Sequence, residues 1–417
     1  MNYKMSIPET VDITNKTFTT QPIPDNIQFR LNRLFKKRVS FYEIAPERNE
    51  KITLISRIIG PYAINTMIRL SRFYQSPDFT KEVDKIRKFK IPDMGVTVDD
   101  VVKALQKRNI KVYLHGGLIR DIFLGVKSTD IDLVFDVDVA KIEPICQEEG
   151  YPCADIMIRE QYINFGVEKG ASLEGSNLKN SYLVPLYARE ATVNDFSYDL
   201  QNDIIIDAGG HGLQDVLYRK IRLTPYPHQW KYWAKDWKKP FRYFKLIQKG
   251  FKPMHPGIND FIVNYITDNY DTVYDKEIAK NYPIKRMKHF LVSTITNGII
   301  NPDGSYHFGP NEHKIISYLE VLKQHLPTEV FQKILSNFSK EDLKKFKDRK
   351  VASNITSLIK SSSTKSSVKS LKTTTKSSNK SIVKTKTKKS NVVSGVGKEE
   401  NIKKSKKTKK SKVSLKN

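Results

Sequence analysis

Apolar residues in the first ninety positions recur mostly at helical spacing. In residues 27–35 and 54–59 they return every three or four positions, which is typical of one buried helix face. Residues 1–25 lack such a pattern. We therefore expect residues 1–25 to be disordered and residues 26–95 to form a helical N-terminal extension.

The pattern changes to short apolar runs after position 110. The run Val112 to Leu114 enters a Gly116-Gly117 turn, a short amphipathic stretch follows, and Asp130 opens a second apolar run. This order predicts strand, glycine turn, helix and strand. Residues 99–110 precede it as a helix, for which Thr97 and Asp99 are both candidate N-caps.

The later segments predict further elements of both kinds. Residues 139–149 have a helical pattern, whereas the polar, glycine-bearing segment 170–180 is typical of a loop. The strand candidates are CADIMI (153–158), YINFGVE (162–168) and SYLVPLYA (181–188). Later helices are expected at 258–266, 287–295 and 315–326. We expect an α+β fold, in which a mixed sheet with helices is followed by a helical neck and body.

Two aspartates and two glycines supply the candidate chemistry. Asp130 and Asp132 lie two positions apart on a predicted strand, so their side chains share one face. Paired carboxylates suit Mg²⁺, which prefers oxygen ligands and keeps positions for substrate phosphates. Gly116 and Gly117 lack Cβ atoms, so their N–H groups can approach a triphosphate closely. Either pair alone is more often an ordinary turn or strand end, and the prediction depends on their ordered combination.

That combination resembles a known signature. LHGGLIRDIFLGVKSTDIDLV (114–134) is similar to the GGxVRDxxLGxxxxDxD motif of the class II tRNA nucleotidyltransferase/poly(A) polymerase family, part of the polymerase-β-like nucleotidyltransferases. REATVNDFSYD (189–199) resembles the family's RDFTINALAYD. IIIDAGGHGLQDVLYRKIR (204–222) resembles its IIDPxGGxxDLxxxxIR. The three blocks occur in the family's order and spacing.

The resemblance implies a template-independent enzyme that adds nucleotides to an RNA 3′ end. Its substrates would be a tRNA or mRNA end and ATP, with CTP as a second candidate, and its cofactor Mg²⁺. Asp130 and Asp132 would be the catalytic metal ligands. Gly116, Gly117 and Arg120 would contact the triphosphate, and Arg189 and Glu190 the ribose. Asn194 would also bind the nucleotide, and Arg242 would contact the base.

The chain departs from the family at two motifs. The family's Arg-Arg-Asp is here Ala188-Arg189-Glu190, and Lys238 and Lys239 replace both acids of its Glu-Asp-x-x-Arg before Arg242. Asp236 and Lys239 offer a shifted Asp-x-x-Lys for base selection if the chain slips by three residues. Lysine is a compact point charge and no bidentate substitute for arginine. We therefore expect looser nucleotide choice than in the family, with the CCA or poly(A) product undecided.

Charge is concentrated at the C-terminal end. The chain carries +27, and residues 360–417 hold 19 Lys and 2 Glu. Because this end of the chain has almost no large apolar groups, we expect residues 351–417 to be a disordered Lys/Ser-rich tail. It would bind RNA phosphates, direct nuclear import, or only solubilise the protein. Residues 96–225 would then form the nucleotidyltransferase head, and residues 226–350 the neck and body. In the neck, Trp230, Trp233 and Trp237 would either stack on bases or form one buried helix face.

Composition limits the protein class. Cys146 and Cys153 are the only cysteines, which excludes a disulfide framework and a cysteine-based zinc cluster. The apolar stretch 58–70 is too short to span a bilayer, and no signal-peptide pattern begins the chain. We expect a soluble intracellular protein, cytoplasmic or nuclear, of undetermined oligomeric state. Two alternatives remain open: a catalytically weak or inactive RNA-binding relative, and a transferase for small molecules or proteins.

Overall fold

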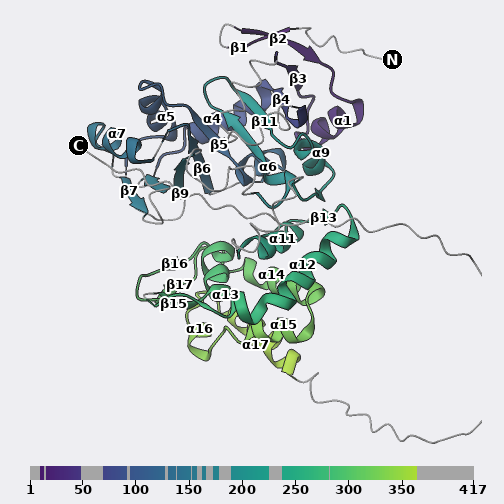
Figure 1. Ribbon diagram of the computed structural model, residues 1–417, viewed down its shortest axis with the longest axis vertical. Helices are drawn as coiled ribbons and strands as arrows, with labels where there is room; N and C mark the ends of the chain where they lie inside the picture. Colours follow the sequence, from purple (N-terminus) through teal and green to yellow (C-terminus); the bar gives the residue numbers. More distant parts are fainter. Residues whose placement is uncertain are drawn as a thin grey trace, which may run out of the picture. The chain divides into compact units, whose positions relative to one another are not determined.

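The structure is a computed structural model of the 417-residue chain (Figure 1). It describes residues 10–13, 16–47, 69–91, 94–126, 130–137, 139–151, 153–156, 162–165, 172–177, 189–224, 237–280 and 282–363. Two regions follow each other along the chain, a sheet with helices and then a mostly helical region.

Among the described residues, eleven strands form one sheet. All neighbouring strands are antiparallel except β6 and β9, which are parallel. The strands in spatial order are β1 (Thr10–Ile13), β2 (Lys16–Gln21), β3 (Tyr42–Ala45), β4 (Arg72–Gln75), β11 (Ile204–Asp207), β10 (Phe196–Asp199), β5 (Val112–His115), β6 (Asp130–Phe135), β9 (Ser172–Asn177), β8 (Tyr162–Phe165) and β7 (Cys153–Ile156).

Helices pack on this sheet around an aromatic core. Phe123 lies at its centre, with its ring centroid 4.7 Å from that of Phe79 and 5.5 Å from that of Phe196. All three rings are fully buried. The helices of this region are α1 (Asp25–Leu34), α4 (Pro77–Arg87), α5 (Val98–Gln106), α6 (Gly117–Phe123), α7 (Ile142–Glu148) and α9 (Gly212–Leu217), with the 3-10 turns η1 (Val139–Lys141) and η2 (Thr192–Asn194).

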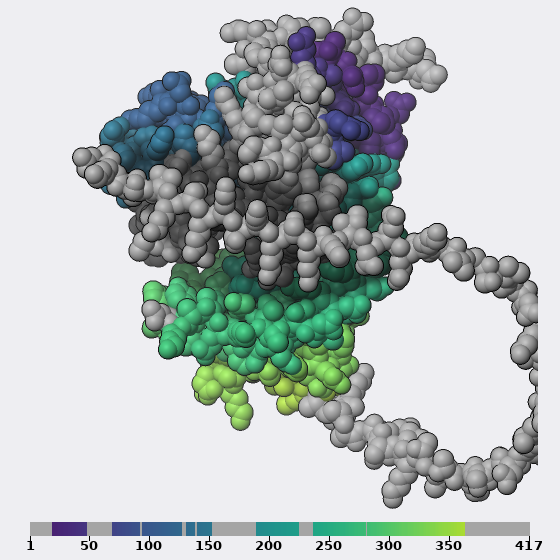
Figure 2. Space-filling model, viewed as in Figure 1, coloured from purple at the N-terminus to yellow at the C-terminus, as the bar shows by residue number. Residues whose placement is uncertain are grey.

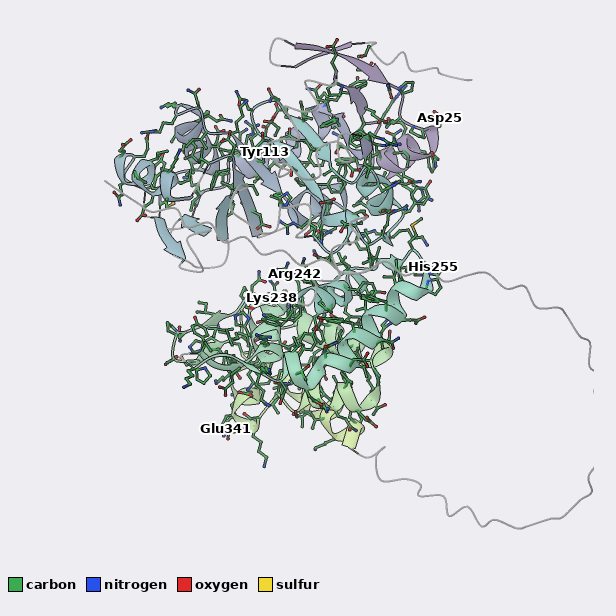
Figure 3. All side chains as sticks on the ribbon, in the orientation of Figure 1. Asp25, Tyr113, Lys238, Arg242, His255 and Glu341 are labelled. Carbon is green, nitrogen blue, oxygen red and sulfur yellow. The ribbon has the colours of Figure 1, made fainter. Side chains whose placement is uncertain are left out.

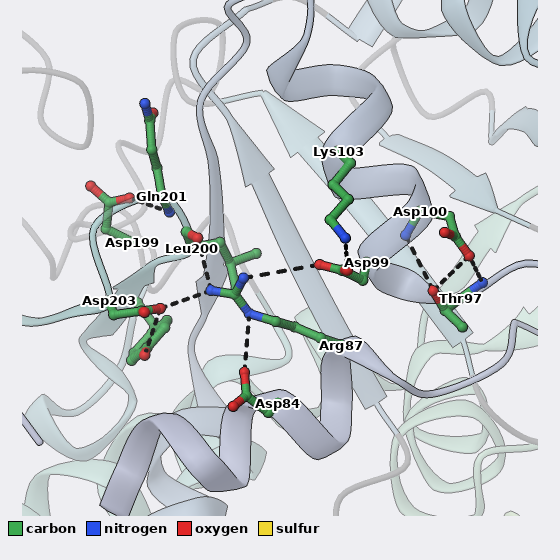
Figure 4. A network of polar contacts seen from close by, with 11 residues as sticks. Asp84, Arg87, Thr97, Asp99, Asp100, Lys103, Asp199, Leu200, Gln201 and Asp203 are labelled. Carbon is green, nitrogen blue, oxygen red and sulfur yellow. Dashed lines mark hydrogen bonds and ion pairs between the residues drawn. The ribbon is translucent and has the colours of Figure 1, made fainter. Parts of the chain in front are cut away.

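Polar contacts fix helices α4 and α5. The N-cap of α5 is Thr97, whose Oγ1 accepts the Asp100 N–H while the Asp100 carboxylate accepts the Thr97 N–H. Thr97, not Asp99, is therefore the cap. Figure 4 shows Arg87, at the end of α4, donating to the Leu200 carbonyl and to Asp203, both at 2.8 Å. Arg87 thereby ties α4 to the turn between β10 and β11.

The second region is mostly helical and forms the green to yellow surface in Figure 2. Its core contains Phe241, Phe290 and Tyr318, all fully buried, and the Tyr318 hydroxyl donates to the Phe241 carbonyl at 2.9 Å. Its helices are α11 (Lys239–Gln248), α12 (Pro256–Asn269), α13 (Arg286–His289), α14 (Lys314–His325), α15 (Thr328–Leu335), α16 (Lys340–Lys344) and α17 (Arg349–Ser363), with the π-helical turns η3 (Tyr270–Tyr274) and η4 (Phe290–Ile295).

Three short strand pairs complete this part of the chain. In one, β12 and β13 run parallel, which links the end of the sheet region to the segment after α11. The pairs are β12 (Lys220–Ile221) with β13 (Lys252–Pro253), β14 (Glu277–Ala279) with β15 (Tyr282–Lys285), and β16 (Ile299–Ile300) with β17 (Tyr306–His307).

The α+β class expected from the sequence is confirmed. Strand β5, the Gly116 turn, helix α6 and strand β6 follow in the predicted order. Helix α7 lies within the predicted 139–149, and β7 and β8 lie within two of the predicted strands. The strand expected at 181–188 lies outside the described residues. Within the described ranges, each helix is either too short or too polar to cross a lipid bilayer.

The N-terminal part differs from the expected disordered and helical segments. Strands β1 and β2 occupy part of residues 1–25, and β3 and β4 extend the sheet beyond β11. Residues 18–21 and 72–75 are rich in Thr, Phe and Tyr, which favour strands. Within the described residues of this part, α1 and α4 are helices as expected. Residues 54–59, which have a helical pattern, lie outside the described residues.

Two other segments also differ from the sequence expectation. Ser172–Asn177, expected as a loop, is strand β9, because it pairs in parallel with the open edge of β6 and its polar composition conceals this backbone role. Helix α17 extends to Ser363, inside the expected disordered tail 351–417. It is held by buried Val351 and Ile355, which are spaced for one helix face. The rest of the tail lies outside the described residues.

Candidate active site

Two arginines pack against the glycine turn at the end of β5. Gly116 has φ +74°, a conformation that favours glycine, and a Cβ there would lie 3.0 Å from Nη2 of Arg189. A Cβ on Gly117 would lie 3.1 Å from Nη2 of Arg120. Gly116 is therefore favoured by its backbone conformation as well as by the close guanidinium, whereas at Gly117 a Cβ would only displace the end of Arg120 slightly.

A chain of buried polar contacts runs beside this turn. Arg120 donates from Nε to Asp121 at 2.8 Å and from Nη1 to the Asn194 side-chain oxygen. Asn194 in turn donates to Oε1 of Glu190 at 2.7 Å. Lys249, at the C-cap of α11, donates to both oxygens of Asp121 at 2.9 and 3.2 Å. Asp121 therefore has both oxygens engaged by protein donors and braces the turn.

One carboxylate oxygen in this chain has no protein partner. Glu190 is only 3% exposed, and its Oε2 accepts no hydrogen bond within the described part of the chain. Buried polar atoms without partners are costly and are concentrated at functional sites. Glu190 also lines the pocket described next. A ligand hydroxyl in that pocket would satisfy this oxygen.

A pocket of about 610 Å³ lies beside the turn, within the range of small-ligand sites. Both regions of the chain line it. From the sheet region come Gly117, Leu118, Arg120, Asp121, Val126, Asp132, Arg189, Glu190 and Asn194. From the helical region come Arg242, Lys245, Leu246, Gln248, Lys249, Ser293, Thr294, Ile295, Asn297, Asn311, Lys314 and Ser317.

The lining is electropositive and suits a polyanion. Six of the lining residues are basic and three are acidic. A cleft with one dominant sign of charge concentrates ligands of the opposite sign. The basic residues are Arg120, Arg189, Arg242, Lys245, Lys249 and Lys314, and the acidic ones are Asp121, Asp132 and Glu190.

The residues present fit a magnesium site at the start of β6. Asp132 lines the pocket, and Asp130 precedes it by two positions on the same strand, so the two positions lie on one face of β6. For Asp130 only the backbone is described. The parallel register places Glu174 of β9 directly beside Asp132. Within the described residues no group of three or more His, Cys, Asp or Glu could hold a metal, so the fit depends on the Asp130 and Asp132 pair.

Of the base-contact candidates, Arg242 lines the pocket and Lys239 does not. Arg242 lines the pocket from α11 and lies at the start of the helical region, near Lys238 (Figure 3). Lys239 is fully buried and is not part of the pocket lining, which argues against direct base contact. Asp236 lies outside the described residues. Trp237 packs partly buried, edge-to-face with His289 at 5.8 Å, which favours the buried-face interpretation for this tryptophan.

Sequence reasoning missed part of the pocket wall. Lys245 and Lys249 follow Arg242 at three- and seven-residue spacing on α11, so helical periodicity could have shown that they share its face. Lys314 and the pocket residues of 293–297 come from distant segments, and no local motif marks them. His115 accepts from Nε of Arg189 at 3.0 Å, a contact between residues 74 positions apart that no local motif marks.

Comparison with known sequences gives one informative match. No family model matches the chain. The chain is similar to poly(A) polymerase I of Haemophilus influenzae, 26% identical over 183 residues, which covers 38% of this chain. The match spans 40% of the length of that protein. It confirms the resemblance to the tRNA nucleotidyltransferase/poly(A) polymerase family that the three motifs predicted.

Solved structures give weaker likenesses. A CCA-adding enzyme in complex with CTP is 16% identical with a TM-score of 0.37, covering 64% of this chain and 51% of that one. A tRNA-processing enzyme in an apo form is 17% identical with a TM-score of 0.41, covering 62% and 63%. A tRNA nucleotidyltransferase complexed with a primer tRNA and an incoming ATP analog is 17% identical with a TM-score of 0.41, covering 58% and 65%. At these values the structural likenesses add no argument.

Proposed function

We propose that the chain is an RNA nucleotidyltransferase that transfers a nucleotide from a nucleoside triphosphate to an RNA 3′ end. The observation that carries the proposal is the lining of a single pocket. It contains residues from the glycine turn, the Asp-x-Asp strand, the Arg189 motif and the start of α11. The first two of these segments lie in one motif, residues 114–134, and the other two follow at residues 189–194 and 242–249. Each carries one part of the chemistry that the transfer requires.

Each part of the pocket has a role in this reaction. The N–H group of Gly117 and the guanidinium of Arg189 would bind the triphosphate. The Gly116 N–H, expected from the sequence to contact the triphosphate, instead donates to the Phe196 carbonyl at 2.9 Å. Glu190 would accept a ribose hydroxyl at its unpaired Oε2. Arg242 would contact the base. Arg120 keeps the turn in place through Asp121 and Asn194, and its remaining N–H groups would reach the phosphates.

Asp130 and Asp132 would hold Mg²⁺, which supplies activation of the attacking hydroxyl and charge compensation for the leaving pyrophosphate. The RNA 3′-oxygen forms a bond to the α-phosphorus, and the bond to the pyrophosphate oxygen breaks. The protein contributes alignment of the two substrates and fixed positive charge around the phosphates. We infer that ATP is the preferred nucleotide and that tRNA or mRNA supplies the 3′ end.

A transfer assay tests this function. The protein is incubated with each of the four labelled nucleoside triphosphates in turn, with tRNA lacking its 3′ end or with an unstructured oligonucleotide, in Mg²⁺ or EDTA. Magnesium-dependent extension of either RNA supports the proposal. Labelling of small-molecule or protein acceptors in place of RNA would identify a different substrate class.

A second candidate is a catalytically weak or inactive relative that binds RNA through its basic surface. The loss of both acids before Arg242 favours it, because base selection in the resembling family requires them. RNA binding without Mg²⁺-dependent extension by any nucleotide would support this candidate and reject the main proposal.

A further inference from the structure

His115 is a buried polar residue directly before the glycine turn, and the functions assigned above do not use it. It ends strand β5, is 1% exposed, and pairs in the sheet with Ser197 of β10. Its imidazole lies between two side chains. Nδ1 is 2.9 Å from the Ser197 hydroxyl, and Nε2 is 3.0 Å from Nε of Arg189.

These two contacts define the protonation of the ring. The Nε–H of Arg189 can only donate, so Nε2 of His115 must carry a lone pair and accept. In the neutral ring the proton is then on Nδ1, which donates to the Ser197 oxygen. Burial, and secondly the charge of Arg189, lower the pKa of His115 well below its usual range. His115 is therefore a neutral acceptor.

The contact fixes the guanidinium of Arg189 over Gly116. At that glycine a Cβ would meet Nη2, Cζ and Nη1 of Arg189 at 3.0 to 3.2 Å, so the guanidinium lies flat against the turn. The main chain of Arg189 is anchored separately, because its carbonyl accepts the Thr224 hydroxyl at 3.0 Å. Main chain and Nε are thus both held, and Nη1 and Nη2 lie at the turn.

We propose that His115 is a positioning residue that holds Arg189 at the phosphate-binding turn without cancelling its charge. The proposal rests on the proposed function, since it assigns the Arg189 guanidinium to the triphosphate. A carboxylate at position 115 would also bind Arg189 but would neutralise the charge that a polyanion requires. An aliphatic residue would leave a buried N–H without a partner. A neutral imidazole acceptor avoids both effects.

A double-mutant cycle between positions 115 and 189 tests this proposal. His115→Leu removes the acceptor at similar volume, whereas His115→Gln keeps an acceptor at a similar reach. Each variant is made alone and with Arg189→Ala. Equilibrium binding of a fluorescent ATP analogue in Ca²⁺, KM for ATP, KM for RNA and kcat are measured. His313→Leu, an exposed histidine of the helical region, is the matched control.

We expect His115→Leu to weaken ATP-analogue binding and raise KM for ATP about tenfold, as for loss of one hydrogen bond to a charged group. KM for RNA should stay constant, and His115→Gln should restore most of the binding. In the Arg189→Ala background, His115→Leu should have no further effect.

Additive effects in the cycle, or equal loss in the Leu and Gln variants at unchanged thermal stability, would overturn the positioning role while leaving the transfer activity intact. A wild-type protein that binds no nucleoside triphosphate would reject both proposals. If it binds nucleotide but transfers none, only the proposed transfer activity is rejected. The binding measurements of the double-mutant cycle then still test the positioning role of His115.

Discussion

Lys249 and Asp121 form an ion pair between residues 128 positions apart, with Nζ 2.9 Å from Oδ2; the carboxylate is buried and the lysine is partly exposed. Lys249 ends α11 and Asp121 lies in α6, so the pair joins the helical region to the glycine-turn helix. Asp121 is simultaneously bound by Arg120, which continues through Asn194 to Glu190. The position of the glycine-turn helix is thus coupled to that of α11 by side-chain charge.

Lys249→Met should destabilise the protein by about 1–2 kcal/mol, because the buried carboxylate of Asp121 loses one donor but keeps Arg120. Methionine retains the apolar stem of lysine. Urea denaturation measures the free energy of unfolding, and Lys252→Met, an exposed lysine of β13, provides the control. Equal stability of the two variants would show that the pair contributes nothing.

Asp132→Ala should abolish nucleotide transfer while leaving the fold intact. Without this carboxylate the triphosphate charge is not compensated, and the expected loss in rate is about a thousandfold or more. Single-turnover extension and circular dichroism are measured together, with Glu143→Ala on the exposed face of α7 as control. Wild-type activity in a folded Asp132→Ala protein would reject the metal site.

Asp195→Asn should stabilise the protein at neutral pH. Both carboxylate oxygens of Asp195 are buried without a hydrogen-bond partner in the described part of the chain. Burial, and then the charge of Asp207, raise its pKa well above the usual range. Burial likewise raises the pKa of Asp207 from 3.8 to about 6. The gain expected from removing the uncompensated charge is about 1–3 kcal/mol.

The sign of the pH dependence follows from these raised values. Both carboxyls bind protons more tightly in the folded state, so their contribution to stability falls as pH rises from the unfolded pKa through the folded one. Between about pH 4 and about pH 7 the wild type should lose more stability than Asp195→Asn. Asp207→Asn should destabilise instead, because the Asp207 carboxylate accepts the N–H groups of Gly212 and Leu213 at 3.1 and 3.0 Å. Urea denaturation across this pH range decides.

Deleting residues 368–417 tests the basic tail. The segment carries 17 Lys and 2 Glu, and the cut leaves α17 intact. If the tail neutralises phosphates, truncation should weaken binding of all RNA sequences alike and flatten the dependence of affinity on salt. Single-turnover transfer at saturating RNA should hardly change. Identical salt slopes for both proteins would indicate a solubilising or targeting role.

Nucleotide choice should be looser than in the family that the chain resembles, with ATP favoured. A site built to hydrogen-bond one base rejects others through unpaired polar groups. Here Lys238 and Lys239 replace the two acids that the family has before Arg242, so the acceptors for the base edge are lost. Single-nucleotide extension assays measure this directly. Strict addition of CTP and then ATP, stopping after three nucleotides, would contradict the prediction. Discrimination that disappears in Asp236→Ala would identify the shifted motif as the selector.

The sequence predicted the parts of the site whose backbone demands are local. Gly116 and Gly117 indicated a turn, where Gly116 has the positive φ that favours glycine, and the two-residue spacing of Asp130 and Asp132 indicated one strand face. Thr97 and Asp99 were indistinguishable as caps until the reciprocal bonds with Asp100 were seen. Local chemistry limits the backbone, but it does not choose between neighbouring polar residues with similar capping ability.

The parts that sequence did not predict depend on partners far along the chain. Strand β9 is polar, and its backbone pairs with β6 on one side and with β8 on the other. The far wall of the pocket comes from 293–297 and 311–317, which carry no motif of their own. His115 looked like the end of a strand, and its role depends on Arg189, 74 positions later.

The order of strands in the sheet also determines when the protein can fold during synthesis. Strand β4 pairs with β11, and Phe73 lies opposite Ile206, so its sheet neighbour on that side is synthesised about 130 residues later. At ribosomal rates that interval is on the order of ten seconds. During this interval the apolar side chains of β3 and β4 lack the neighbouring strand β11 and the rest of the sheet that will bury them. We therefore expect β4 to remain open to chaperones until β11 has been synthesised.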